Sequence, residues 1–239
     1  MGRTRETHPS NSIDQFKCAP TSTFSAKWSV PPRVREPLLK RPLDFILSGF
    51  GLLFSSPLWL LIAAAIKLDD GGPVFYTQER VGLSGVTFKS WKFRSMRVET
   101  DKKFGPLQAS EGDSRVTRVG RTLRPAAADE LPQLWNIFRG DMSFVGPRAL
   151  MTREIEVNGR GEAVLLESIP GYHLRHSVKP GLTGIAQVYA PRDISRRHKF
   201  LFDKIYVKKQ TFCLDLKLII VSFWISFNGK WESRAKRKF

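Results

Sequence analysis

The residues best suited to chemistry surround two adjacent acids, Asp129 and Glu130, in the stretch AAADELPQLWN. Basic side chains lie on both sides of this pair, at Lys92, Arg94, Arg115, Arg118, Arg121, Arg124 and Arg148. Guanidinium groups suit phosphate oxygens because both are built for paired hydrogen bonds. A carboxylate beside a bound divalent cation and phosphate-binding arginines can attack phosphorus. The stretch therefore predicts chemistry at a phosphate group.

A purely structural interpretation of the acid pair stays open beside this one. Helical spacing is kept by the apolar residues that follow the pair, Leu131, Leu134, Ile137 and Phe138. Asp129 could then be a helix cap and Glu130 a first-turn acid, with the arginines in surface ion pairs. Free N–H groups and the helix dipole favour an ionised carboxylate there, so we expect Asp129 to stay charged at neutral pH.

Two elements must position these side chains. The runs VFYTQERVG and VTFKSWKF are aromatic and β-branched and are joined by LSG, which predicts an antiparallel hairpin. The helix that follows the acid pair is expected to end before Gly140, since glycine is common just after a helix.

An uncharged stretch of 22 residues, Phe45–Ile66, precedes the hairpin. As a helix it would be about 33 Å long, which matches the hydrocarbon core of a bilayer. Ser56 and Pro57 interrupt it at the midpoint, where proline removes an amide donor. The segment is either a kinked spanning helix or a re-entrant hairpin of two half-helices. The flank before Leu43 has eight Lys+Arg against three acids, so both flanks have the positive charge of cytoplasmic segments.

The sequence divides into three parts. Residues 1–38 are rich in Ser, Thr and Pro and predict a disordered leader without a secretory cleavage site. Residues 39–68 form the membrane segment, and residues 69–239 form a catalytic domain with interfacial helices and a basic tail. The late stretch LDLKLIIVSFWISF is too short in its uncharged part to span a membrane, so we expect it in the core or at the membrane interface.

Composition limits the partners. The chain of 239 residues has 39 Lys+Arg against 22 Asp+Glu, a net charge of +17, which requires an anionic partner. Cys18 and Cys213 lie far apart, so neither a disulfide framework nor a zinc cluster is indicated. A membrane-anchored nucleic-acid-binding protein would share this charge, but no nucleic-acid reading motif is present, and we predict no nucleic-acid partner.

Several motifs, taken in order, resemble one family. They are KRPLDF, the apolar run broken at Ser56–Pro57, GGPVFYTQERVG, FKSWKFRSM, RVTRVGRTLRPAAADELPQLWNIFRGDMSFVGPR and PGLTGIAQV. Together they are similar to the bacterial sugar transferases, the monotopic phosphoglycosyl transferases of exopolysaccharide and glycoconjugate synthesis. The similarity covers nearly everything from Lys40 to about Leu218.

The resemblance implies an enzyme that moves a phosphosugar from a UDP-sugar to polyprenyl (undecaprenyl) phosphate, releasing UMP. By this likeness Asp129 is the nucleophile that holds the phosphosugar covalently, and Glu130 is the ligand of Mg²⁺. The substrate-binding residues it implies are Lys92, Arg94, Arg118, Arg124 and Arg148. The family's membrane helix turns back at Ser56–Pro57, which favours the re-entrant topology.

The implied fold is α+β and mainly helical, with a re-entrant membrane helix-break-helix, a small antiparallel β-hairpin and a cytosolic helical catalytic domain. The implied location is the cytoplasmic face of the bacterial inner membrane. Anionic membrane lipid, a second copy of the chain in a homodimer and downstream glycosyltransferases are the further expected partners. A non-catalytic scaffold of a polysaccharide export complex remains an alternative function.

The sequence departs from the family pattern in two places. Ala149 stands where the GPR motif usually continues with proline, and PAAADE replaces a segment that more often carries Lys, Thr or Ser. These departures bear on which sugar is used more than on the type of reaction.

Overall fold

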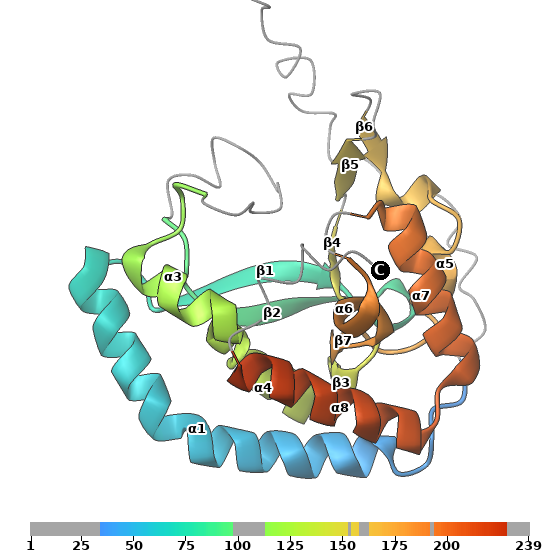
Figure 1. The fold of residues 1–239 in the computed structure, drawn as a ribbon, viewed down its shortest axis with the longest axis horizontal. Helices are drawn as coiled ribbons and strands as arrows, with labels where there is room; N and C mark the ends of the chain where they lie inside the picture. The colour runs from blue at the N-terminus through green and yellow to red at the C-terminus, as the bar shows by residue number, and fades with distance from the viewer. Residues whose placement is uncertain (1–33, 98–112, 153, 158–162, 192–193, 229–239) are drawn as a thin grey trace, which may run out of the picture.

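The computed structural model describes residues 34–97, 113–152, 154–157, 163–191 and 194–228 (Figure 1). The predicted leader up to residue 33 and the basic tail from residue 229 lie outside the described residues. The helices are α1 (Lys40–Asp70), α3 (Arg118–Leu123), α4 (Gln133–Arg139), α5 (Tyr172–Arg175), α6 (Ile185–Tyr189), α7 (Arg196–Lys209) and α8 (Phe212–Phe227). The strands are β1 (Phe75–Val81), β2 (Thr87–Phe93), β3 (Ser143–Val145), β4 (Leu150–Met151), β5 (Ile155–Val157), β6 (Ala163–Leu165) and β7 (Gly181–Thr183). Short 3-10 turns connect them, at η2 (Leu83–Gly85), η3 (Arg124–Ala126), η4 (Ala128–Glu130) and η5 (Leu166–Ser168).

Helix α1 contains the whole apolar segment and bends near its middle (Figure 1). Pro57 lies inside the helix and has no N–H to offer the carbonyl of Leu53. The Ser56 hydroxyl donates to that carbonyl oxygen instead, at 2.7 Å. Because the freed carbonyl keeps a partner, the helix continues through the proline, and the predicted break is a bend within one helix.

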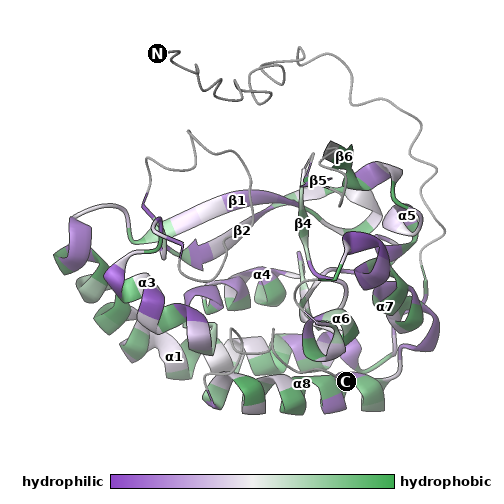
Figure 2. Cartoon of the chain, turned by 45° about the horizontal axis from the view of Figure 1, so that its top comes forward, coloured by the Kyte–Doolittle hydropathy of each residue, from purple (hydrophilic) through white to green (hydrophobic). Residues whose placement is uncertain are grey.

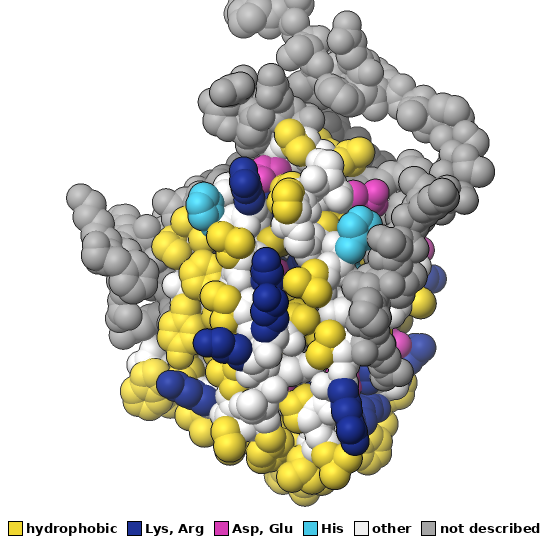
Figure 3. All heavy atoms as spheres, turned by 90° about the vertical axis from the view of Figure 1, so that its right-hand side faces the viewer, with side chains coloured by type: hydrophobic (Ala, Val, Ile, Leu, Met, Phe, Trp, Pro, Cys, Tyr) yellow, Lys and Arg dark blue, Asp and Glu magenta, His cyan; other side chains and the backbone are white. Residues whose placement is uncertain are grey.

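The outer surface of α1 is apolar. Its exposed side chains include Phe45, Ile46, Phe50, Leu53, Phe54, Leu58, Leu60 and Leu61. By length and composition α1 could cross a membrane, and only 11% of its most apolar window is buried within the protein. Helix α8 runs along the same edge of the molecule and exposes Ile220, Phe223, Trp224 and Phe227 (Figure 2). These exposed side chains of α1 and α8 are called the apolar layer below. Seen from the side, hydrophobic side chains dominate this lower end of the molecule (Figure 3).

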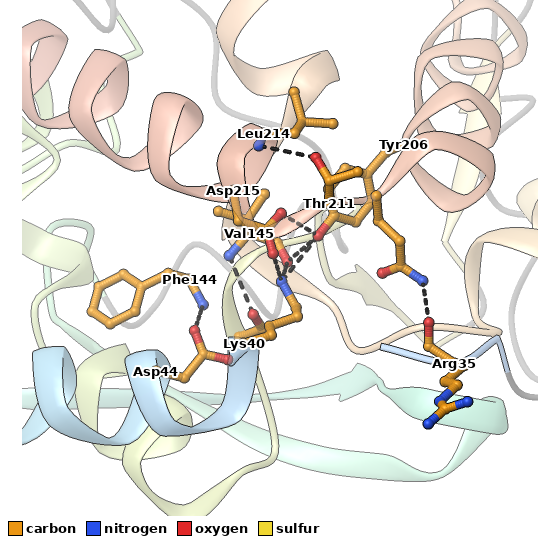
Figure 4. Close-up of polar contacts among 11 residues, drawn as sticks. Arg35, Lys40, Asp44, Phe144, Val145, Tyr206, Thr211, Leu214 and Asp215 are labelled. Carbon is orange, nitrogen blue, oxygen red and sulfur yellow. Dashed lines mark hydrogen bonds and ion pairs between the residues drawn. The ribbon is translucent and has the colours of Figure 1, made fainter. Parts of the chain in front are cut away.

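A buried ionic cluster fastens the start of α1 to the C-terminal helices (Figure 4). The Lys40 ammonium forms an ion pair with Asp215 of α8 at 2.7 Å, with both side chains almost fully buried. It also donates to the Tyr206 hydroxyl of α7 at 2.9 Å and to the Val145 carbonyl of β3 at 2.8 Å. One turn later, Asp44 accepts the Phe144 N–H at 3.0 Å. Four elements therefore meet at the first turns of α1.

The rest of α1 also packs on the same domain. Arg41 donates to the carbonyls of Ile137 and Phe138, at 2.7 and 2.8 Å, and so caps the end of α4. Past the bend, Ile62 and Ile66 join the hydrophobic cluster that contains Phe93 and Leu123. Burying one such side chain fully stabilises a fold by about 1.5–3 kcal/mol. Both halves of α1 are thus anchored on one domain.

The predicted hairpin is confirmed. Strands β1 and β2 pair antiparallel through the turn η2, and β4 adds to the other edge of β1. The predicted helix after the acid pair is also confirmed as α4, followed by Gly140 in a left-handed conformation with φ of 96°. The parallel pair β3–β7 was not predicted from the sequence. The fold therefore mixes helices with small sheets, as expected.

Candidate functional site

The acid pair lies on its own short turn. Asp129 and Glu130 belong to the 3-10 turn η4, while α4 begins only at Gln133, with Pro132 as its N-cap. Ala127 separates this turn from the preceding one and has a φ of 56°. That left-handed conformation costs an alanine about 1 kcal/mol. The expectation that the pair starts the helix is therefore wrong by one turn, because Ala127 and Pro132 set off the acids as a separate unit.

Glu130 faces two cationic side chains. Its carboxylate accepts from the Lys92 ammonium at 2.5 Å and from the Arg148 guanidinium at 3.3 Å. Burial by itself would raise the pKa of Glu130, but the charges of Lys92 and Arg148 outweigh it and lower the pKa to about 2. Glu130 is therefore ionised at neutral pH.

Asp129 is more deeply placed, with 9% of its surface exposed. The Ser95 hydroxyl lies 3.3 Å from its Oδ2 and donates to it. Burial raises the pKa of Asp129, and the charges of Lys92 and Arg124 only partly oppose this effect. The direction is the opposite of the one expected from a helix start, because Asp129 gains no helix dipole and is removed from water.

A small pocket opens beside Glu130 and gathers positive charge. It is lined by Arg80, Ser90, Lys92, Glu130, Gln133, Met142, Arg148, Ala149, Gly181 and Leu182. Arg148 reaches it because GPR follows β3, which pairs in parallel with β7 of the PGLTG stretch. This pairing needs glycines, since a Cβ on Gly181 would lie 2.0 Å from the Gly146 nitrogen. The two motifs are thus one structural unit that carries Arg148.

Three of the predicted substrate-binding residues gather at the acid pair. Lys92 and Arg148 contact Glu130 directly, and Arg124 lies near enough for its charge to lower the pKa of Asp129. They come from β2, from the loop after β3 and from the turn η3. The site is therefore assembled from several short elements.

The other two predicted residues lie elsewhere. Arg94 is 4% exposed and forms an ion pair with Asp70 at the end of α1. Strand β2 ends at Phe93, so the chain turns and Arg94 does not continue the face that carries Lys92. Arg118 is exposed and lines a second cavity of about 210 Å³ with Asp69, Asp70, Arg97 and Thr117. Within the described residues, neither Arg94 nor Arg118 forms a hydrogen bond or ion pair with Asp129 or Glu130.

Sequence reasoning missed Ser95, Arg80 and Gln133. Ser95 contacts Asp129, and the other two line the pocket beside Glu130. Arg80 lies in the QERVG run of the predicted hairpin, and this position was the sequence signal that could have identified it as a site residue. Gln133 directly follows the DELP stretch and lies in the first turn of α4.

The acid pair supplies oxygen donors of the kind that Mg²⁺ prefers. The described residues contain no group of three or more His, Cys, Asp or Glu side chains that could hold a metal. Mg²⁺ in nucleotide enzymes often has one or two carboxylate ligands, and water and substrate phosphates complete its shell. The adjacent carboxylates Asp129 and Glu130 fit that sparse mode of binding.

Comparison with known proteins places the chain in a family. The sequence profile of the family described as "Bacterial sugar transferase" matches residues 35–229. A Klebsiella pneumoniae protein named UDP-glucose:undecaprenyl-phosphate glucose-1-phosphate transferase is 40% identical over 199 residues, which cover 81% of this chain and 41% of that protein. A protein of the same name from Caulobacter vibrioides is 41% identical over 196 residues, covering 79% of this chain and 70% of the relative.

A shorter relative covers a similar part of the chain. The exopolysaccharide production protein ExoY of Rhizobium meliloti is 37% identical over 196 residues, covering 76% of this chain and 82% of that protein. The chain thus spans about two fifths of the Klebsiella relative's length and most of the ExoY length. All three similarities include most of the chain, and with it the acid pair and its cationic neighbours.

Proposed function

The chain belongs to the bacterial sugar transferase family, and we propose that it transfers a sugar-1-phosphate from a UDP-sugar to undecaprenyl phosphate. The products are undecaprenyl-diphosphate-sugar and UMP, and the reaction begins the synthesis of a polysaccharide. The observation that carries the proposal is Asp129, a buried carboxylate next to Glu130 and near the charges of Lys92 and Arg124. Two relatives are named for glucose-1-phosphate transfer, so glucose is the first sugar to test.

In the first step, a carboxylate oxygen of Asp129 attacks the β-phosphorus of the UDP-sugar. A bond forms between that oxygen and phosphorus, and the bond from phosphorus to the bridging oxygen of the diphosphate breaks. UMP leaves with the bonding electrons, and the sugar phosphate stays on Asp129 as an acyl phosphate. Burial favours the attack, because a carboxylate with a raised pKa is more basic and less stabilised by its surroundings.

In the second step, an oxygen of undecaprenyl phosphate attacks the same phosphorus. A new bond to the lipid phosphate forms, the bond to Asp129 breaks, and the carboxylate is regenerated. An acyl phosphate is a good phosphoryl donor, which explains why a carboxylate serves as the nucleophile.

The cationic side chains act on the charge of the diphosphate. Lys92 and Arg148 hold Glu130 in the resting site and can turn to phosphate oxygens when the substrate enters. Glu130, with Asp129 beside it, is the residue that would hold Mg²⁺. When bound, Mg²⁺ neutralises charge on the diphosphate and its leaving oxygen.

The path of α1 supports a re-entrant topology. Lys40 at one end and Asp70 at the other both pair with residues of the same domain, Asp215 and Arg94. A helix that crossed the bilayer would carry one end to the opposite side, away from this domain. The bend at Pro57 lies between the two anchored ends, among exposed apolar side chains. We therefore propose that the helix dips into one leaflet and that the catalytic domain rests on the cytoplasmic face of the inner membrane, the side that the positive charge of both flanks favours.

Topology can be tested with a tag at the N-terminus. We expect the tag and the catalytic domain to react with a membrane-impermeant reagent only after the inner membrane is opened. A tag at the C-terminus is the control for the side on which the domain lies. Labelling of the N-terminal tag from the periplasm of intact spheroplasts would show a spanning helix and overturn the re-entrant topology.

The activity test uses membranes or detergent-purified protein with a panel of radiolabelled UDP-sugars. UMP release and labelled lipid are measured with and without undecaprenyl phosphate and with and without Mg²⁺. UDP-glucose and UDP-N-acetylgalactosamine lead the panel because relatives are named for these sugars. The wild-type protein should release UMP with at least one of them, and release should fall when Mg²⁺ is chelated.

The matched variant is Asp129→Asn, which keeps the shape and removes the nucleophile. We expect it to lose UMP release by at least about a thousandfold. Its melting temperature should stay equal or rise, because ionised Asp129 is destabilised by burial and asparagine carries no charge. Turnover by this variant at a wild-type rate would exclude Asp129 as the nucleophile.

A further inference from the structure

A third cationic side chain, Arg80, shares the pocket with Lys92 and Arg148. Arg80 lies near the end of β1 and lines the pocket that Glu130 also lines. It is partly buried and pairs across the hairpin with Phe88. Nothing in the proposed mechanism has used this side chain so far.

Two hydrogen bonds hold Arg80 in place. One amino group donates to the Ala149 carbonyl at 2.9 Å, next to Arg148 in the chain, and the other donates to the Gln78 side-chain oxygen at 2.5 Å. A guanidinium has five N–H donors. Within the described part of the chain, the hydrogen bonds of Arg80 use two of these five donors, one on each terminal nitrogen. Each terminal nitrogen therefore has a partner. The group is therefore held rigidly while donors remain for a ligand.

The charges of the pocket do not balance. The lining contains three positively charged side chains, Arg80, Lys92 and Arg148, and the negatively charged carboxylate of Glu130. Burial and the nearby charge of Arg148 lower the pKa of Arg80 to about 10, so it still carries its charge at neutral pH. Glu154, whose charge also acts on Arg80, is paired with Arg196. Like charges gathered in a partly desolvated pocket favour an anion, and two excess positive charges match a phosphate monoester.

The stereochemistry of the two steps indicates which phosphate this is. In phosphoryl transfer the attacking and leaving oxygens lie roughly in line on opposite sides of phosphorus. In the first step UMP leaves from the side opposite Asp129. In the second step the lipid phosphate must attack from the side opposite Asp129, since Asp129 is then the leaving group. The phosphate of UMP and the phosphate of the lipid therefore occupy the same place in turn.

We propose that Arg80, together with Arg148, forms a single phosphate subsite that holds the departing UMP phosphate and then the incoming lipid phosphate. The inference rests on the proposed function, because it assumes both half-reactions at Asp129. Arg80 is a binding residue in this scheme and forms no covalent bond. Its planar fork matches two phosphate oxygens in one fixed geometry, whereas a lysine ammonium acts as a point charge.

The test compares Arg80→Gln, which removes the charge, with Arg80→Lys, which keeps it and loses the fork. Arg139→Gln is the matched control, since Arg139 is exposed and outside the pocket. Binding of UMP and of farnesyl phosphate, a short lipid phosphate, is measured by calorimetry on purified protein, and KM is measured for both substrates. Melting temperatures show whether each variant is folded.

In the wild-type protein, farnesyl phosphate should displace UMP. Arg80→Gln should weaken binding of both ligands, and raise KM for both substrates, by about tenfold or more. Arg80→Lys should fall between wild type and Arg80→Gln, and Arg139→Gln should match the wild type.

Three results would overturn the subsite. The first is simultaneous binding of UMP and farnesyl phosphate to the wild-type protein. The second is weaker binding of only one of the two ligands to Arg80→Gln. The third is a lower melting temperature of Arg80→Gln with both affinities unchanged, which would mean that Arg80 only supports the Arg148 loop. A wild-type protein that releases UMP from no UDP-sugar would instead refute the proposed function, whatever the binding results.

Discussion

At the scale of single residues, Asp129 and Glu130 are chain neighbours with opposite electrostatic surroundings. Burial has the larger influence at Asp129, whereas Lys92 and Arg148 outweigh burial at Glu130. Carboxylates whose pKa values are pushed apart are suited to different tasks. The more basic oxygen belongs to the residue proposed as nucleophile, and the firmly ionised one belongs to the residue proposed to hold Mg²⁺.

Glu130 also makes stability depend on pH. Its folded pKa of about 2 is below its ordinary value of 4.5, so it stabilises the fold above pH 4.5. This contribution is lost as the pH falls from about 4.5 to about 2, and it amounts to about 3 kcal/mol. We expect Glu130→Gln to be less stable at pH 7 and to show a flatter profile in that window, measured by thermal unfolding in detergent.

The control for this measurement is Glu79→Gln, a change at an exposed residue of β1. It should reproduce the wild-type profile between pH 2 and pH 7. If wild type and Glu130→Gln lost stability in parallel on acidification, the ion pairs of Glu130 would contribute nothing to the fold.

At the scale of elements, α1 is tied to the domain by the buried pair of Lys40 and Asp215. Lys40→Met should destabilise the protein by about 3–5 kcal/mol, because it leaves the Asp215 carboxylate buried without its cation. The double variant Lys40→Met with Asp215→Leu should recover part of the loss, since neither charge is then buried alone. Chemical denaturation in detergent measures both effects.

An exposed ion pair supplies the comparison. Arg139 and Asp141 lie 3.7 Å apart, and the Arg139 side chain is 56% exposed. Arg139→Gln should change the free energy of unfolding by less than about 1 kcal/mol. An equal effect of Lys40→Met and Arg139→Gln would show that the buried cluster does not anchor α1.

Elements with a local pattern could be predicted from the sequence, and elements made by distant pairing could not. The hairpin has alternating residues and a glycine-containing turn, and α4 has its apolar spacing and Gly140. Strands β3 and β7 are three residues each and lie in separate motifs, so only the folded chain shows their pairing. The same holds at the site, where Ser95 contacts Asp129 and Arg80 lines the pocket beside Glu130, both from other elements. Of the two interpretations of Ser56–Pro57, a kinked helix and two half-helices, the structure has the kinked helix, because the Ser56 hydroxyl bonds within its own helix.

At the scale of the whole molecule, the apolar layer and the charge of the chain act together. In the proposed membrane-bound state, the exposed faces of α1 and α8 would supply apolar contact with lipid, and a net charge of +17 would attract the domain to anionic head groups. Under the proposed function, such an arrangement would bring a soluble nucleotide sugar and a lipid phosphate to one site at the membrane surface.

The contribution of α8 can be measured separately from that of α1. Phe223 and Trp224 are 73% and 67% exposed, so replacing both with serine should leave the fold intact and reduce the fraction bound to vesicles that contain anionic lipid. Val86→Ser is the matched control, because Val86 is 71% exposed on the hairpin. Vesicle flotation measures the bound fraction. Equal retention of all three proteins would mean that α8 does not contact lipid.

The contact between Lys40 and Asp215 also sets an order of events during synthesis. The two residues are 175 positions apart in the chain, which a ribosome needs roughly 10 to 35 s to make at about 5–20 residues per second. During that interval α1 has emerged while its anionic partner does not yet exist, so the ammonium of Lys40 must stay in water or among lipid phosphates. Helix α1 is therefore complete before the partner of Lys40 exists, and its first turn is locked to the domain last, when the C-terminal helix arrives.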